Sequence, residues 1–142
     1  MISYFNEDIK FDLKNKRIIS AWIKSIIESK GYNRGDINII FTSDEYLLSV
    51  NKKYLGHDYY TDIITFDYCE DRRVSGDLFI SIDSVKANAQ DFKQEFLTEL
   101  HRVIIHGVLH MTGYDDHTPE DVAAMRKAED EALQILDTLL VK

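Results

Sequence analysis

Cysteine, proline and glycine are scarce in this chain, which has one cysteine, one proline and six glycines among 142 residues. The single cysteine, Cys69, excludes an internal disulfide and fits a reducing compartment, so we expect a structural thiol. No linker, internal repeat or low-complexity tract interrupts the sequence, and we therefore expect one domain over residues 1–142. A hydrophobic fraction of 44% is sufficient for a core of its own.

Long apolar runs are also lacking. No run approaches the roughly 18 residues that a membrane-spanning helix requires. The first residues have neither the basic head nor the apolar stretch of a secretory signal. We therefore expect a cytoplasmic protein without a membrane partner.

Positive charge is in deficit, because 25 acidic residues stand against 17 basic ones and the net charge is −8. This balance excludes a protein that holds nucleic acid by phosphate neutralisation alone. A role on RNA would need a local basic face or a partner that supplies affinity. Candidate basic pairs, each of which can equally be ordinary solvated side chains, are Lys52 with Lys53, Arg72 with Arg73, and Lys86 with Lys93.

Helical and strand-like periods alternate along the chain. Apolar residues recur at helical spacing over residues 18–27, before Gly31, and further helices are expected at about 43–54, from about 84, at about 95–112 and from Thr118. Strand-like runs cover residues 2–5, 36–42, 61–68 and 76–82, and the last two predict a hairpin. The expected fold class is α+β: one small domain with a mixed sheet of about four strands, packed by helices.

The most informative segment is His106-Gly-Val-Leu-His110, which lies in an apolar helical run and is followed by Gly113 and His117. Residues at i and i+4 share a helix face, so two imidazoles can converge on one metal ion. A glycine can adopt the left-handed conformation that ends a helix, and a histidine beyond the turn can supply a third ligand. Three protein ligands and one open position are typical of catalytic zinc.

Two other interpretations of this segment fit the sequence less well. A His-x-x-x-His pair is often only a solvated helix face, but here His106 and His110 stand among apolar residues, and buried imidazoles need partners. The protease motif His-Glu-x-x-His is absent, since Gly107 follows His106 and offers no carboxylate as general base. A peptidase is therefore disfavoured.

Three other short sequence segments precede the histidine segment. They are Asn51-Lys-Lys-Tyr54 through Asp58, Thr61-Asp62-Ile-Ile-Thr-Phe66, and Gly76-Asp77-Leu-Phe-Ile. Together with His106 through Asp115, these segments resemble the YbeY family of metal-dependent endoribonucleases over most of the chain.

The resemblance implies a single metallohydrolase domain that binds one zinc ion per chain through His106, His110 and His117, on the penultimate helix and the turn after it. It further implies a single-strand-specific endoribonuclease in ribosomal RNA maturation and small-subunit ribosome quality control in the cytoplasm. The implied partners are ribosomal RNA or the pre-ribosomal small subunit, with ribosomal proteins, and neither DNA nor a membrane.

The chain departs from the family pattern in the turn. The family places its third histidine directly after Gly-Tyr-Asp, where this chain has Asp116, and His117 comes one residue later. We favour His117 as the third ligand, because imidazole is the family's ligand here and a loop can absorb one residue. Asp116 is the alternative and would give a His₂Asp site that discriminates less against manganese or magnesium.

A second departure lies at Leu55, where the family carries an arginine for the scissile phosphate. Leucine cannot make the paired charged hydrogen bonds of a guanidinium, so the catalytic residues remain unassigned. His57 and Arg102 are candidate replacements, while Asp115 and Asp62 are candidates for orienting a ligand imidazole.

The negative charge and Leu55 also favour a second function, a metal-stabilised ribosome assembly factor with little nuclease activity. A third, a metallohydrolase of a small substrate, fits the acidity but not the extended resemblance.

Overall fold

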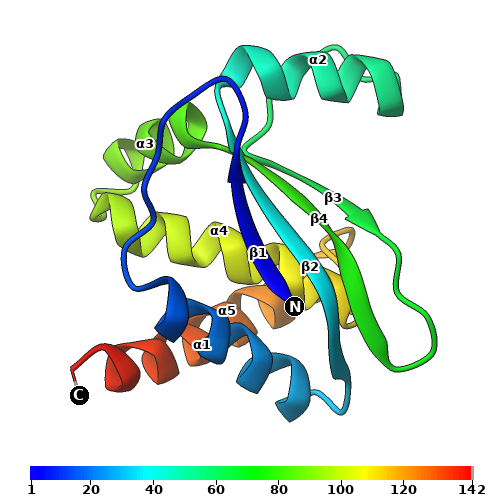
Figure 1. The fold of residues 1–142 in the computed structure, drawn as a ribbon, viewed down its shortest axis with the longest axis vertical. Coiled ribbons are helices and arrows are strands. Elements are labelled where there is room, and N and C mark those ends of the chain that lie inside the picture. Colours follow the sequence, from blue (N-terminus) through cyan, green and yellow to red (C-terminus); the bar gives the residue numbers. More distant parts are fainter. Residues whose placement is uncertain (142) are drawn as a thin grey trace.

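Four strands form one mixed sheet, in the order β1-β2-β4-β3, in the computed structural model, which describes residues 1–141. The strands are β1 (Ile2–Asn6), β2 (Asn33–Thr42), β3 (Ile63–Asp67) and β4 (Arg73–Ser81). Both β1 and β4 pair with β2 in parallel, whereas β3 pairs with β4 antiparallel (Figure 1). The α+β class, the mixed four-stranded sheet and the hairpin are thereby confirmed.

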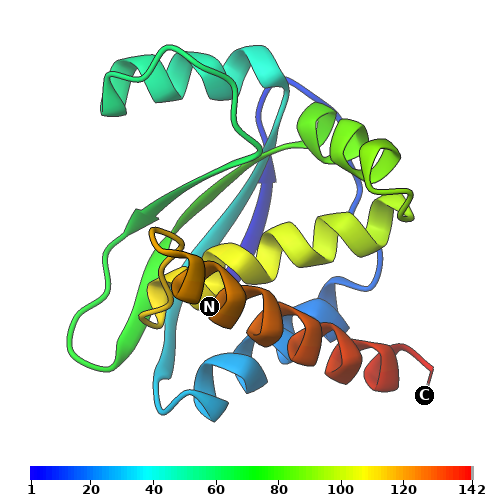
Figure 2. The same ribbon diagram turned by 180° about the vertical axis from the view of Figure 1, so that it is seen from behind.

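Within residues 1–141, five helices accompany this sheet: α1 (Lys16–Ser29), α2 (Asp44–Leu55), α3 (Ile82–Asp91), α4 (Phe96–Met111) and α5 (Pro119–Leu140). Helix α4 packs against β3 and β4, α1 packs against β2, and α5 lies against both of these helices (Figures 1 and 2). Helix α2 contacts β3 and β4 through a separate small apolar cluster that contains Leu47, Val50 and Ile64. Among residues 1–141, no helix is long and apolar enough to cross a membrane.

The main hydrophobic core lies between the sheet and helices α1, α4 and α5, and β3 separates it from the small cluster, because successive side chains of a strand point to opposite faces. Ile63 approaches Gly107 of α4, while Ile64 packs with the α2 residues of the smaller cluster. A Cβ added at Gly107 would lie 2.8 Å from Ile63 Cδ1 and 2.9 Å from Leu78 Cδ2. Gly107 is therefore required by the close approach of α4 to the sheet, which also explains why no glutamate follows His106.

Helix α5 is fixed at its start and along its length. Thr118 and Asp121 form a reciprocal capping box with Pro119 in the first turn, and the helix begins where the sequence predicts, at Thr118. Farther along, the indole of Trp22 in α1 donates a 2.8 Å hydrogen bond to the carbonyl of Ala132. These contacts hold α5 across α1 and α4, and α5 carries a residue of the site described below.

Some boundaries differ from those expected from the sequence. Strand β4 begins at Arg73 instead of Gly76, because Asp71 adopts a positive φ of 53° and a bridge between Glu70 and Arg73 closes a tight turn. Strand β4 ends at Ser81, whose side chain caps α3. The thiol of Cys69 is half-buried, and burial raises its pKa to about 11, as suits a structural thiol.

Candidate active site

His106 and His110 of α4 line one cavity of about 290 Å³. Its other walls come from α2, the segment between α2 and β3, strand β3 and the turn after α4. The residues that line it are Asn51, Leu55, His57, Tyr59, Thr61, Ile63, Ile64, Thr65, His106, His110, Asp116 and His117. The helical spacing and the turn therefore bring all three predicted ligands to the same cavity.

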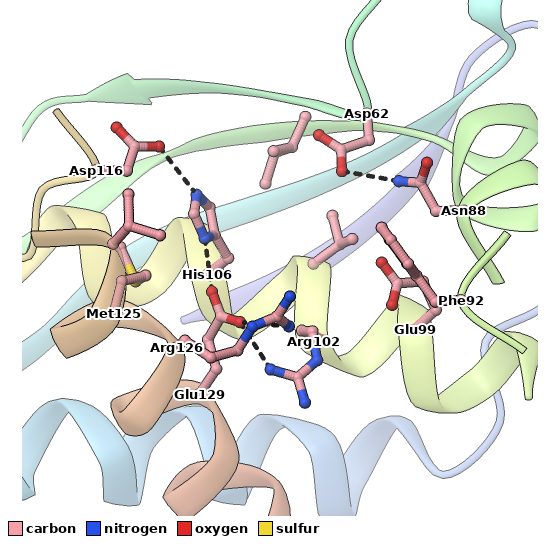
Figure 3. Close-up of a pocket in the computed structure, with 13 residues that line it drawn as sticks. Asp62, Asn88, Phe92, Glu99, Arg102, His106, Asp116, Met125, Arg126 and Glu129 are labelled. Atoms are coloured by element: carbon pink, nitrogen blue, oxygen red, sulfur yellow. Dashed lines mark hydrogen bonds and ion pairs between the residues drawn. The ribbon is translucent and has the colours of Figure 1, made fainter. Parts of the chain in front are cut away.

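A second cavity, of about 470 Å³, lies beside the first and shares His106, Asp116 and Ile63 with it. Figure 3 shows His106 between Asp116 on one side and Glu129 on the other, with Asp62 and Asn88 farther along. The shared residues make His106 and Asp116 the boundary between the two cavities.

A carboxylate lies near each ring nitrogen of His106. Its Nδ1 lies 2.7 Å from Oε2 of Glu129, and its Nε2 lies 3.7 Å from Oδ2 of Asp116 (Figure 3). The hydrogen bond to Glu129 raises the pKa of His106 above its ordinary value, although burial opposes the shift. Burial acts to raise the pKa of Glu129, but hydrogen bonds from His106 and Arg102 outweigh burial, and this pKa is lowered.

Glu129 was missed by the sequence reasoning. It lies on the apolar stripe of α5 formed by Met125, Ala128 and Ala132, and its side chain is only 7% exposed. A carboxylate within a buried helical stripe requires a charged or hydrogen-bonding partner. The position of Glu129 in that stripe was therefore the feature of the sequence that indicates a buried partner. The structure identifies the partners as His106 and Arg102.

The guanidinium of Arg102 is bonded to two carboxylates. Its guanidinium lies 2.8 Å from Glu129 and 2.7 Å from Asp130, and its side chain is 21% exposed. Both bonds raise its pKa against the opposing effect of burial. Arg102 therefore serves to hold Glu129, and the structure gives no support to its use on a phosphate.

His57 and Leu55 lie on the opposite wall of the smaller cavity. The His57 ring stacks on Tyr59, with ring centroids 5.1 Å apart, and its Nδ1 lies 2.9 Å from the Tyr59 hydroxyl. Leu55 is 45% exposed. An arginine at this position would extend from the cavity wall, whereas the leucine leaves the wall without that charge.

The predicted orienting carboxylates occupy other places. Asp62 accepts a 3.2 Å hydrogen bond from Asn88, and burial raises its pKa above the ordinary value. It lines the larger cavity with His106. Asp115 precedes Asp116 in the turn and lines neither of these two cavities.

Two of the three basic pairs have partners elsewhere in the fold. Lys52 lies 3.3 Å from Asp58, Lys53 lies over the ring of Tyr54, and Arg73 lies 3.5 Å from Asp36. Arg72 stacks over Tyr32. None of these residues lines either cavity of the site.

The donor atoms fit a zinc-type ion, but they are not assembled into a finished ligand set. The Nδ1 atom of His110 is buried and has no hydrogen-bond partner within residues 1–141, a cost that a ligand could offset. Over the same residues, no three His, Cys, Asp or Glu side chains are grouped closely enough to hold a metal. The assignment of His106, His110 and His117 as ligands stays a prediction.

Comparisons with known proteins agree over nearly the whole chain. A family model described as Endoribonuclease YbeY matches residues 1–137. Proteins named Endoribonuclease YbeY from Parabacteroides distasonis and Phocaeicola vulgatus are each 51% identical, over 95% and 96% of this chain and 95% and 99% of their own lengths. The solution structure of TM1509 from Thermotoga maritima has a similar fold, with a TM-score of 0.67 at 24% identity, covering 96% of this chain and 89% of that one.

Proposed function

Because the chain belongs to the Endoribonuclease YbeY family, we propose that it is a zinc-dependent, single-strand-specific endoribonuclease acting in ribosomal RNA maturation and small-subunit ribosome quality control in the cytoplasm. Its substrate would be ribosomal RNA or the pre-ribosomal small subunit. The observation that carries the proposal is the lining of one cavity by His106, His110 and the turn of Asp116 and His117.

One zinc ion per chain would be held by His106, His110 and a third ligand from the turn. Gly113, with a φ of 104°, directs that turn back from the end of α4. A bound zinc ion would supply a Lewis acid and make water acidic enough to react near neutral pH. The absence of a glutamate beside His106 is then no obstacle to hydrolysis.

Asp62 is placed to exchange a proton in the reaction. Burial raises the pKa of its carboxyl, Asn88 fixes its position, and it lines the same cavity as His106 and Asp116. A carboxyl group beside the proposed ion site can exchange a proton with the oxygen that leaves when the phosphodiester breaks. Asp62→Asn should lower single-turnover cleavage by about 10²-fold or more while zinc affinity changes little.

The missing arginine favours weak intrinsic cleavage. Leu55 provides no charge for the phosphate, and Arg102 is bound by two carboxylates. These observations also support the second candidate, a metal-stabilised ribosome assembly factor that cleaves little by itself.

The test is cleavage of one structured RNA that contains single-stranded and paired segments, by purified protein with zinc or with a chelator. Zinc-dependent cuts confined to single-stranded segments, absent in His110→Ala, would support the nuclease. Circular dichroism of His110→Ala would show that the variant folds. Zinc binding without cleavage above the His110→Ala background, together with binding to small-subunit precursor particles, would instead support the assembly factor.

A further inference from the structure

The contacts at the two ring nitrogens of His106 indicate which residues would bind the proposed ion. We propose that Glu129 orients His106 so that its Nε2 faces Asp116, and that Asp116, not His117, completes a His₂Asp ion-binding set with His106 and His110. This inference rests on the proposed function, since both require a bound ion.

Glu129 determines which nitrogen of His106 is available. A carboxylate only accepts hydrogen bonds, so at 2.7 Å the Nδ1 of His106 is the donor and carries the proton. In the neutral ring, the lone pair is then on Nε2. A carboxylate behind a metal-binding histidine is the usual arrangement that fixes the tautomer and the ring orientation.

Glu129 is itself held firmly. Its Oε1 lies 2.8 Å from Arg102 and 3.6 Å from Arg126, so Oε2 is left for His106. Arg102 bridges from Glu129 to Asp130, which is 54% exposed. Asp130 thus shares the same arginine without touching the histidine, and it provides a matched control.

Asp116 faces the available nitrogen of His106. Two ligand atoms about 2.05 Å from a tetrahedral zinc ion lie roughly 3.3 Å from each other. The observed separation of Asp116 Oδ2 and His106 Nε2 is 3.7 Å, close to that spacing and too long for a direct hydrogen bond. A small shift of the turn would place both atoms on one ion.

His117 lines only the smaller cavity, whereas Asp116 lies 3.7 Å from His106 Nε2 and lines both cavities. A set of two imidazoles and one carboxylate is harder in character than three imidazoles. The protein should therefore bind manganese better relative to zinc than a three-histidine site would.

The test is the affinity for Zn²⁺ and Mn²⁺, measured by competition with a chromophoric chelator, for wild type and five variants. We expect Asp116→Asn to lower zinc affinity more than 100-fold and Glu129→Gln to lower it 10- to 100-fold. His117→Ala and Asp130→Asn should stay within about threefold of wild type. Restoration of most of the affinity by Glu129→Asp would show that the carboxylate itself is needed.

Imidazole nitrogen NMR of the metal-free wild type gives a second readout that does not depend on a variant folding. The proton of His106 should be found on Nδ1. If it is on Nε2, the role of Glu129 is overturned.

The outcomes separate this inference from the proposed function. If His117→Ala empties the site and Asp116→Asn leaves it filled, Asp116 is not the ligand, while the zinc enzyme stands. If wild type binds no ion, the zinc-dependent function and this inference both fail.

Discussion

The two walls of the small cavity are built differently. The wall on α4 carries His106 and His110, and behind it Glu129 of α5, which lines the larger cavity, joins His106 to Arg102. The opposite wall, from the end of α2 to β3, presents exposed Leu55, His57 and Tyr59. The first wall is preorganised by two packed helices, which suits ion binding, whereas the second is a solvent-exposed segment that would meet a substrate.

This contrast implies that changes to the two walls should have separate consequences. Substitutions on the helical wall should affect ion binding and stability. Substitutions on the exposed wall should affect cleavage while the fold and the ion stay intact.

The largest effect is expected for His106→Ala and His110→Ala, each of which should lower zinc affinity by more than about 100-fold, because loss of a ligand exceeds the loss of a group behind it. Zinc content after dialysis against a weak chelator measures the effect. His57→Ala, on the exposed wall, is the control and should keep its zinc. Full zinc occupancy in both His106→Ala and His110→Ala would show that this wall does not bind the ion.

Gly107→Ala should destabilise the protein by about 2 kcal/mol, because the added methyl overpacks α4 against the sheet. The free energy of unfolding in urea measures this effect. The double variant Gly107→Ala with Ile63→Val lacks the Cδ1 atom that lies 2.8 Å from the added Cβ, and it should recover part of the loss. Equal stability of wild type and Gly107→Ala would show that α4 can move away from β3 at little cost.

Leu55→Arg should raise single-turnover cleavage by up to about tenfold without changing zinc affinity. The new charge would stabilise the phosphate in the transition state, but an unsupported side chain gains less than the 10²- to 10³-fold of a preorganised contact. Leu55→Gln is the uncharged control at the same position. Fast single-turnover cleavage by wild type that Leu55→Arg does not change would show that another residue binds the phosphate.

The smallest effect concerns pH in the metal-free protein. The hydrogen bond to Glu129 raises the pKa of His106 in the folded protein. The free energy that this bond contributes to folding is therefore fully present below about pH 6.5, the ordinary pKa of histidine, and is lost as pH rises through the folded-state pKa. Glu129 has a lowered pKa, so its contribution is present above about pH 4.5 and is lost in more acidic solution. The pair should therefore contribute most between these limits, on the order of 1 kcal/mol.

Unfolding free energies of wild type and Glu129→Gln in chelator, from pH 4 to pH 9, measure this contribution. Their difference should narrow above neutral pH. A difference that is flat across the range would show that the proton on His106 does not depend on Glu129.

Local patterns in the sequence were enough to predict most of the elements. The i, i+4 spacing of His106 and His110 correctly places both side chains at one cavity, and the Thr118 cap correctly starts α5. The position of β4 between β2 and β3 depends on pairing between distant segments. Periodicity carries no information about such pairing.

The supporting part of the site could not be predicted for the same reason. Glu129 meets His106 across 23 residues and on a different helix, so their contact depends on the crossing of α4 and α5. Which residue of the turn faces His106 depends on backbone dihedrals after Gly113, and a one-residue change in register exchanges Asp116 for His117. Sequence spacing alone leaves both possibilities open.

The hydrogen bond between α1 and α5 gives the protein a built-in optical probe. Trp22 is the only tryptophan of the chain, it is fully buried, and its indole donates to Ala132, within one turn of Glu129. Its fluorescence therefore reports whether the helix that carries Glu129 is docked. A variant that loses its ion but keeps the wild-type emission maximum has lost a ligand contact, whereas a red-shifted emission reveals that α5 has separated from the rest of the fold.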